Sequence, residues 1–185
     1  MALLKVLTRP RKRKIGSLSI AHFPTASVVQ NNMFDETVIY DDGSYTGGFN
    51  GYVTNFNQLS VSYGTDVVLS NSVYQSSWLG NYYIPTNSAL TNVGSTTADQ
   101  LGLYQYTTHT NQVKQSNNLV DIGYHYVAVD SSGNPIDTDG SGVADYLKDA
   151  NGNGLVDSGE INWTNAADIG LTVIITRPSN NSPIP

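Results

Sequence analysis

The stretch from Asp149 to Glu160, DANGNGLVDSGE, has oxygen-bearing residues at the spacing of a twelve-residue calcium loop. Such a loop places its ligands at positions 1, 3, 5, 7, 9 and 12 and a glycine at position 6. Ca²⁺ is a hard cation that takes oxygen ligands, and a glycine allows the sharp turn with positive φ around the ion. Gly154 stands at position 6, and the expected ligands are Asp149, Asn151, Asn153, the carbonyl of Leu155, Asp157 and Glu160. The alternative, a polar turn without an ion, is the weaker interpretation because all of these positions match in register.

A second, less complete copy lies directly upstream, in residues 137–148, DTDGSGVADYLK. Gly142 is again at position 6, and the expected ligands are Asp137, Asp139, Ser141, the carbonyl of Val143 and Asp145. Lys148 stands at position 12, where a complete loop has a bidentate acid. We therefore expect this first loop to bind calcium more weakly than the second, through water, or only when the second is filled.

The segments around the loops differ from those of a calcium sensor, in which an amphipathic helix flanks each side of each loop. VAVDSSGNPI, before the first loop, alternates and then turns, which indicates a strand end and a loop. Between the loops, residues 144–148 could form little more than one helical turn, and INWTNAADIG after Glu160 offers a short turn. The sequence therefore predicts that the loops stabilise a connector and do not act as a switch.

The composition indicates a β protein with many turns. Among 185 residues, 39% are apolar, which is sufficient for a core, and 13% are charged. Asn, Ser, Thr, Gly and Tyr are abundant, which favours short strands and turns. No apolar run approaches the ~20 residues of a membrane span. The chain has no cysteine, so bound calcium is a natural substitute for disulfides, since an ion that binds only the folded state stabilises it.

Charge is segregated along the chain. Six of the nine basic residues lie in residues 1–14, and the rest of the chain has three basic residues against fifteen acids. An acidic body does not attract nucleic acid. Residues 1–14 are expected to be a disordered basic extension, with an arm for nucleic acid or anionic lipid as the less favoured alternative.

Short β-prone runs separated by Gly, Asn, Asp and Pro fill residues 15–130, and helical periodicity is nearly absent. Strands are predicted at residues 17–23, 26–32, 36–42, 51–57, 66–72, 81–85, 102–108 and 121–129. Such spacing without intervening helices favours a sandwich, a barrel or a β-solenoid. Asn31 and Asn32 could form a stacked asparagine turn of a parallel β-helix, although an ordinary turn is the commoner explanation of such a doublet.

The stretch LGNYYIPTNSALTNVGS (79–95), followed by VDIGYHY (120–126), resembles the terminal coil of bacterial secreted right-handed parallel β-helix proteins of the pectate-lyase-like kind. NNMFDETVIY (31–40) resembles the preceding coil, and residues 137–160 are similar to the EF-hand-like or thrombospondin type 3-like calcium-loop connector of long bacterial surface proteins. Ala89 departs from the pattern, because proline is usual there. The matching residues are Tyr83, Ser88, Leu90, Gly94, Ser95, Asp121, Ile122, Gly123 and Tyr126.

The resemblance implies a mainly β fold: the C-terminal coils and cap of a β-solenoid (parallel β-helix), then a short calcium-loop segment and a final strand. The aromatic-rich region 78–126 could supply the cap that the open edge of a last coil requires. The expected parts are residues 1–14 as the extension, 15–130 as coils and cap, 131–168 as tandem loops, and 169–185 as a strand (169–176) and linker. A chain that ends on a linker is expected to belong to a larger protein.

No catalytic residue is predicted. The sequence contains neither a G-x-S-x-G nor an H-E-x-x-H motif, and it has no cysteine nucleophile. The sequence has three histidines, His22, His109 and His125; His125, between two tyrosines on an expected strand, is interpreted as a structural or half-exposed residue, and His109 as a loop residue. Asp41 and Asp42 are adjacent, so on a strand they would point to opposite faces. The tyrosines could stack on sugars, but aromatic residues in sheets usually pack against each other.

The leading hypothesis is a non-enzymatic, extracellular or cell-surface structural module. Ca²⁺ in one or two loops would rigidify the junction after a β-solenoid, within a larger surface or adhesin-like protein. Calcium ions are the expected partners, with glycans or neighbouring modules of the same polypeptide as further candidates, and neither nucleic acid nor a membrane span is expected. The alternative is a fragment of a polysaccharide-active or glycan-binding parallel β-helix whose active coils lie upstream.

Overall fold

The computed structural model describes residues 16–20, 27–35, 37–41, 45–53, 58–61, 63–72, 74–168 and 170. Residues 1–14 and the predicted final strand at 169–176 lie outside this part, apart from Gly170. The described part is mainly β, as the composition predicted, and it contains no helix long and apolar enough to cross a membrane. Its elements are β1 Gly16–Ile20, β2 Ser27–Gln30, β3 Met33–Phe34, β4 Thr37–Asp41, β5 Tyr45–Gly48, β6 Gly51–Val53, β7 Val67–Leu69, β8 Gln75–Ser77, β9 Gly80–Tyr83, η1 Asp99–Leu101, β10 Tyr106–Thr107, β11 Tyr126–Val127 and α1 Asp145–Lys148.

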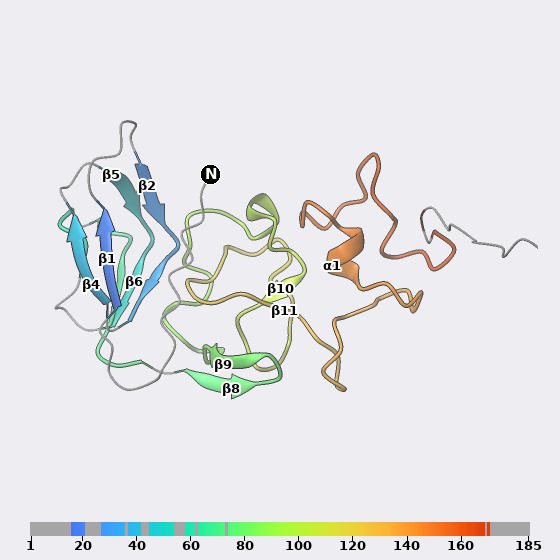
Figure 1. The fold of residues 1–185 in the computed structure, drawn as a ribbon, viewed down its shortest axis with the longest axis horizontal. Helices are drawn as coiled ribbons and strands as arrows, with labels where there is room; N and C mark the ends of the chain where they lie inside the picture. The colour runs from blue at the N-terminus through green and yellow to red at the C-terminus, as the bar shows by residue number, and fades with distance from the viewer. Residues whose placement is uncertain are drawn as a thin grey trace, which may run out of the picture.

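The first seven strands pair in parallel across similar sequence intervals. β1 pairs with β4, β2 with β5, and β6 lies between β3 and β7. The partners lie 16 to 21 positions apart: Gly16 with Thr37, Ser27 with Tyr45, Met33 with Gly51, and Gly51 with Val67. These strands form one end of the molecule (Figure 1).

Apolar side chains from successive turns of this region pack on each other. Phe34 and Tyr52 are register partners on β3 and β6, and their rings stack with centroids 5.2 Å apart and an interplanar angle of 15°. Both are buried in a cluster that also contains Val29, Tyr45 and Leu59. At this position the parallel register therefore aligns two aromatic residues, which pack along the pairing direction.

The two asparagines of the Asn31–Asn32 doublet have different roles. Asn32 donates from Nδ2 to Oδ1 of the fully buried Asn50 at 3.2 Å, and Asn50 N donates to Asp66 Oδ1 at 2.9 Å. These side chains thus continue the strand ladder through the turns. Asn31 instead has a positive φ of 61° and exchanges two 2.8 Å hydrogen bonds with Ser95. It links the parallel strands to the segment that follows them.

The segment after β7 packs against the parallel strands. Ile84, Leu90 and Ile122 are fully buried, and Met33, Val67 and Leu69 of β3 and β7 pack against them. A Cβ at Gly51 would lie 2.9 Å from Leu90 Cδ2 and 3.1 Å from Ile122 Cγ2, so a glycine is needed for this close approach. Region 78–126 therefore covers one end of the parallel strands.

The segments 79–95 and 120–126 lie side by side. Gly94 N donates to Val120 O at 2.8 Å, and Ile122 N donates to Leu90 O at 2.9 Å. The predicted strands at 102–108 and 121–129 are wrong for most of their length, because only β10 and β11 pair there. The backbone groups of residues 120 and 122 bond to residues 90–96 instead.

Candidate calcium loops

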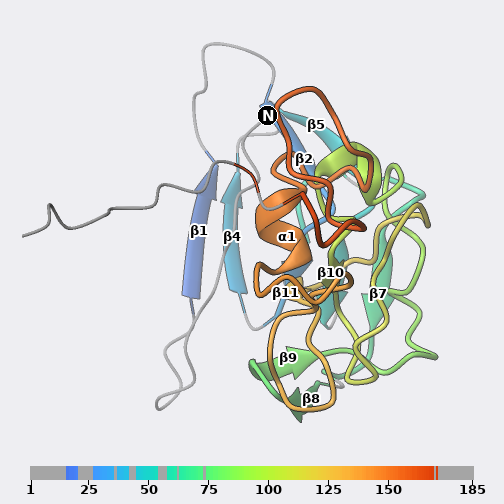
Figure 2. The same cartoon turned by 90° about the vertical axis from the view of Figure 1, so that its right-hand side faces the viewer.

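Both candidate loops lie on the side of the 78–126 region that is opposite the parallel strands (Figure 1). The last four residues of the first loop form α1, and this single turn confirms the short helix expected in residues 144–148. In Figure 2, α1 lies in front of β10 and β11, and residues of the 78–126 region contact both loops. The loops thus occupy a connector at the C-terminal side of the described structure.

The two loops have the same backbone fold. In each, the glycine at position 6 has a positive φ, 86° at Gly142 and 77° at Gly154. Its N–H donates across the loop to the aspartate at position 1, from Gly142 to Asp137 Oδ2 at 2.7 Å and from Gly154 to Asp149 Oδ2 at 2.9 Å. The position-1 carboxylates are therefore turned into the loops.

Residues at positions 3 and 5 are oriented alike as well. In the second loop, Asn153 N donates to Asn151 Oδ1 at 3.0 Å and Leu155 N donates to Asn153 Oδ1 at 2.8 Å. In the first loop, Ser141 N donates to Asp139 Oδ1 at 3.1 Å and Val143 N to Ser141 Oγ at 3.3 Å. Such bonds direct the side-chain oxygens toward the centre of the turn, which is what a calcium loop requires.

The acids of the second loop are held by N–H donors and not by a basic side chain. Asp157 Oδ2 accepts from Nδ2 of Asn151 at 2.7 Å and of Asn153 at 2.8 Å, and these two bonds lower the pKa of Asp157. Glu160 accepts from the backbone N–H of Asn151 at 3.1 Å and of Asp157 at 3.0 Å. In the part of the chain that the structure describes, no group of three or more histidine or acidic side chains has converged as a metal would require. Three of the six predicted ligands are amide or carbonyl oxygens, which form no part of such a group.

In the second loop, the buried carboxylate of Asp149 is the group whose surroundings best fit a bound cation. The residue is 1% exposed, and its Oδ2 accepts from Gln105 Nε2 at 2.8 Å as well as from Gly154 N. Its Oδ1 is buried without a hydrogen-bond partner. A buried carboxylate oxygen without a partner is costly unless a cation compensates it. Asp149 and the surrounding oxygens therefore suit Ca²⁺.

The second loop is docked on the 78–126 region. Tyr104 N donates to Gly152 O at 2.9 Å, and the Tyr104 ring lies against Gly154. Trp163, beyond the loop, packs against Tyr104 with ring centroids 6.1 Å apart. Together with the bond from Gln105 to Asp149, these contacts fix the loop to the body of the molecule.

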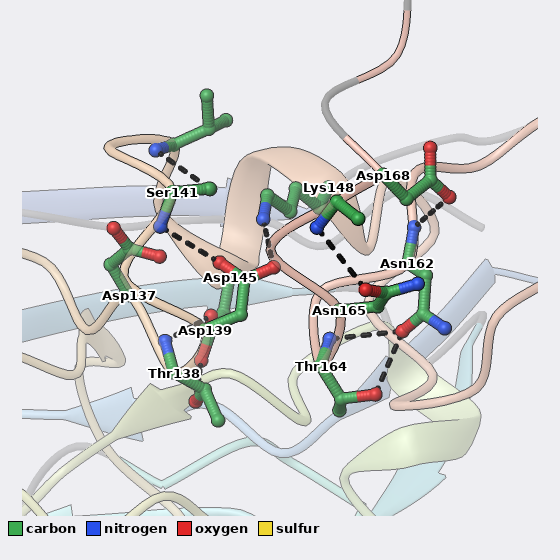
Figure 3. Close-up of polar contacts among 12 residues, drawn as sticks. Asp137, Thr138, Asp139, Ser141, Asp145, Lys148, Asn162, Thr164, Asn165 and Asp168 are labelled. Atoms are coloured by element: carbon green, nitrogen blue, oxygen red, sulfur yellow. Dashed lines mark hydrogen bonds and ion pairs between the residues drawn. The ribbon is translucent and has the colours of Figure 1, made fainter.

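Two lysines contact acids of the first loop: Lys148 from the loop itself and Lys114 from the 78–126 region. Lys148 Nζ lies 2.6 Å from Asp139 Oδ2, and both side chains are almost fully buried. Asp145 is turned toward the body, where it accepts from Thr138 N at 2.8 Å and pairs with Lys114 Nζ at 2.7 Å. Figure 3 shows the Lys148 side chain meeting the Asp139 carboxylate on the side away from Ser141.

A buried ion pair in the 78–126 region was not predicted from the sequence. His109 Nε2 lies 3.2 Å from Asp121 Oδ2, and its Nδ1 lies 2.9 Å from Ile84 O. Thr108 Oγ1 donates to the same carboxylate, whose other oxygen accepts from Asn92 N at 2.7 Å. The sequence pattern gives no signal for the pair, because His109 lies in a stretch that is predicted to be a loop and is twelve positions from Asp121. Both ring nitrogens face acceptors, so the imidazolium is the form that satisfies them.

We expect the stability of the protein to fall as the pH rises through the folded-state pKa of His109. The bond to Asp121 raises this pKa, against the opposing effect of burial. The contribution of a group with a raised pKa is complete below its unfolded value, about 6.5, and is lost as pH rises above it. Urea unfolding at about pH 5.5 and about pH 8.5 checks this. His109→Gln should abolish the part of the slope due to this residue, and an unchanged slope in that variant would assign the pH dependence to other groups.

No protein-family model, no curated protein and no solved structure matches this chain.

Proposed function

We propose that the protein is a non-enzymatic, extracellular structural module that binds one Ca²⁺ in residues 149–160. The buried, unpartnered Oδ1 of Asp149 is the observation that carries this proposal. Asp149, Asn151, Asn153, the Leu155 carbonyl, Asp157 and Glu160 would hold the ion, which would supply the positive charge that this loop lacks.

Charge also favours an ion in the second loop. Asp149, Asp157 and Glu160 provide three carboxylates, and neither of the described lysines, Lys114 and Lys148, pairs with them. A divalent cation would neutralise most of this charge. Because Asp149 is bonded to Gln105 and the Tyr104 ring lies against Gly154, the ion would also fasten the connector to the body of the molecule.

The strand arrangement supports the second part of the proposal, that the connector follows the capped end of a β-solenoid. Parallel pairs at intervals of 16 to 21 residues, the bond from Asn32 to Asn50, and the stacking of Phe34 on Tyr52 are the features expected of successive coils. The apolar cluster around Leu90 and Ile122 would then be the cap.

The tyrosines also support a structural module over a glycan-binding one. Tyr83 and Tyr126 stack with centroids 4.2 Å apart, and Tyr74 packs edge-on against Tyr82 at 5.5 Å. Tyr124 contacts both Tyr82 and Tyr126. These rings pack on each other, and such packing stabilises a core.

Calcium is expected to raise the thermal midpoint and to protect residues 137–160 from protease. An ion at 100 times its Kd stabilises the fold by about 2.7 kcal/mol, which is about 5–10 °C for a domain of this size. Thermal unfolding and limited proteolysis, each in excess Ca²⁺ and in EDTA, measure both effects.

Glu160→Gln should remove most of this difference, because the bidentate closing ligand is lost. Asp168→Asn is the matched control: it removes the same charge outside the loop and should respond to calcium like the wild type. Equal midpoints and equal cleavage of the wild type with and without calcium would contradict the proposal.

A further inference from the structure

We infer that the first loop, residues 137–148, is neutralised by the chain's own lysines and binds no Ca²⁺: the Lys148 ammonium pairs with Asp139, the expected ligand at position 3. The backbone of the first loop and its side-chain oxygens at positions 1, 3 and 5 are arranged like those of the second loop. The loops differ at position 12, where one has Lys148 and the other Glu160. This inference concerns a site separate from the one in the proposed function.

The position of the lysine is specific. Lys148 Nζ lies 2.6 Å from Oδ2 of Asp139, a position-3 residue whose Oδ1 is bonded to Ser141 N. The Lys148 side chain is 0% exposed and that of Asp139 is 2% exposed. A lysine is almost never fully buried unless it is paired. Here α1 places the ammonium against the carboxylate at position 3 of the loop.

The remaining charge of the first loop is also balanced from within the chain. Lys114 Nζ pairs with Asp145 at 2.7 Å and lies 5.2 Å from the centroid of the Trp163 ring. Lys114 and Lys148 are the two basic residues of the part of the chain that the structure describes, and both pair with acids of this loop. Asp137, whose Oδ1 is buried without a hydrogen-bond partner, is the one acid of this loop that lacks a basic partner among the described residues, so a single uncompensated charge is left for a divalent cation.

A consequence follows for the neighbouring loop. Lys148 and Asp149 are consecutive, so the buried lysine fixes the end of α1 and with it the first ligand of the second loop. The first loop is therefore ordered without calcium, and it presents Asp149 in a set position before an ion arrives.

Calorimetric counting of bound calcium tests the inference with the full chain. The wild type should bind one ion, and Lys148→Glu, which completes the ligand set, should bind two. Leu147→Glu is the control, since Leu147 is exposed on α1 and the new acid leaves Lys148 in place; it should bind one. Two ions in the wild type, or one in folded Lys148→Glu, would overturn the inference. No ion in the wild type with one in Lys148→Glu would refute the proposed function and leave this inference standing.

A chemical measurement covers the case in which Lys148→Glu does not fold. Acetylation of the wild-type protein, read by mass spectrometry, should leave Lys148 unmodified both in EDTA and in excess calcium, and the same protein unfolded in urea serves as the reference for reaction. Modification of Lys148 in calcium but not in EDTA would show that the ion displaces the ammonium, and would overturn the inference.

Discussion

Asp121→Ala is expected to destabilise the protein by about 3–5 kcal/mol, because it leaves the charge of His109 buried without its partner. His109 is 9% exposed and Asp121 is 3% exposed, so water reaches neither side chain freely. Asp121 also accepts from Thr108 and Asn92, and these donors would lose their acceptor. Burial raises the pKa of Asp121, but the bonds from His109, Thr108 and Asn92 outweigh it and the net pKa is lowered. Urea unfolding at about pH 5.5 measures the change while the imidazolium is present.

Asp121→Asn is the matched variant for this experiment. It keeps an oxygen for the Asn92 N–H but replaces the charged acceptor that faces His109 and Thr108 by an amide N–H₂, from which neutral His109 can accept a hydrogen bond, so it should cost less than Asp121→Ala. A double-mutant cycle with His109→Gln isolates the coupling between the two side chains. A loss below about 1 kcal/mol for Asp121→Ala, the range of exposed ion pairs, would show that the pair does not hold the segments 79–95 and 120–126 together.

Asp149→Ala is expected to weaken calcium binding by more than about 100-fold, since even the loss of a group outside the ligand shell costs about 10–100-fold. Asp149 supplies the buried, unpartnered oxygen and links the loop to Gln105. Isothermal titration with CaCl₂ gives the affinity.

Gln105→Ala separates the two roles of Asp149. It removes the link to the body but no ligand, so it should weaken calcium binding less than Asp149→Ala does. An affinity of Asp149→Ala within a few-fold of the wild type would mean that the ligand assignment is wrong.

The sequence predicted the mainly β class, the short helix at residues 144–148 and a run of short strands over residues 15–130, which matches the described strands best up to Tyr83. Regular alternation and turn residues mark these features locally. It missed β3, β5 and β8, which are only two to four residues long; β5 also contains two glycines and β8 two serines. It extended the strand at 121–129 too far, because the alternation of VDIGYHYVAV does not reveal that residues 120 and 122 bond to residues 90–96.

At the candidate site, too, local patterns do not reveal contacts between residues far apart in the sequence. The type and spacing of the ligands in residues 149–160 follow from the sequence, as does the anomaly of Lys148 at position 12. The direction in which a lysine extends depends on the helix that carries it, and so its pairing with Asp139 could not be predicted. The ammonium lowers the pKa of Asp139 to about 2. Likewise, no local pattern indicates that Gln105 and Lys114 contact acids of the loops, because these contacts span 44 and 31 positions.

Contacts connect the parallel strands to the 78–126 region and this region to the two loops. Parallel strands with stacked Asn32 and Asn50 end against the cluster of Leu90 and Ile122, and Lys114 and Gln105 of the same region bind the two loops. Calcium in the second loop would therefore stiffen a connector that is already docked. This is the behaviour of a structural clamp and differs from that of a sensor whose helices move apart.

Isothermal titration of the EDTA-treated wild-type chain with CaCl₂ is the most direct measurement of calcium binding in residues 149–160. We predict one binding event per chain, with an affinity in the millimolar range or tighter that Asp149→Ala removes, as for extracellular calcium modules. The absence of binding heat at millimolar calcium, together with an unchanged thermal midpoint, would contradict the calcium clamp.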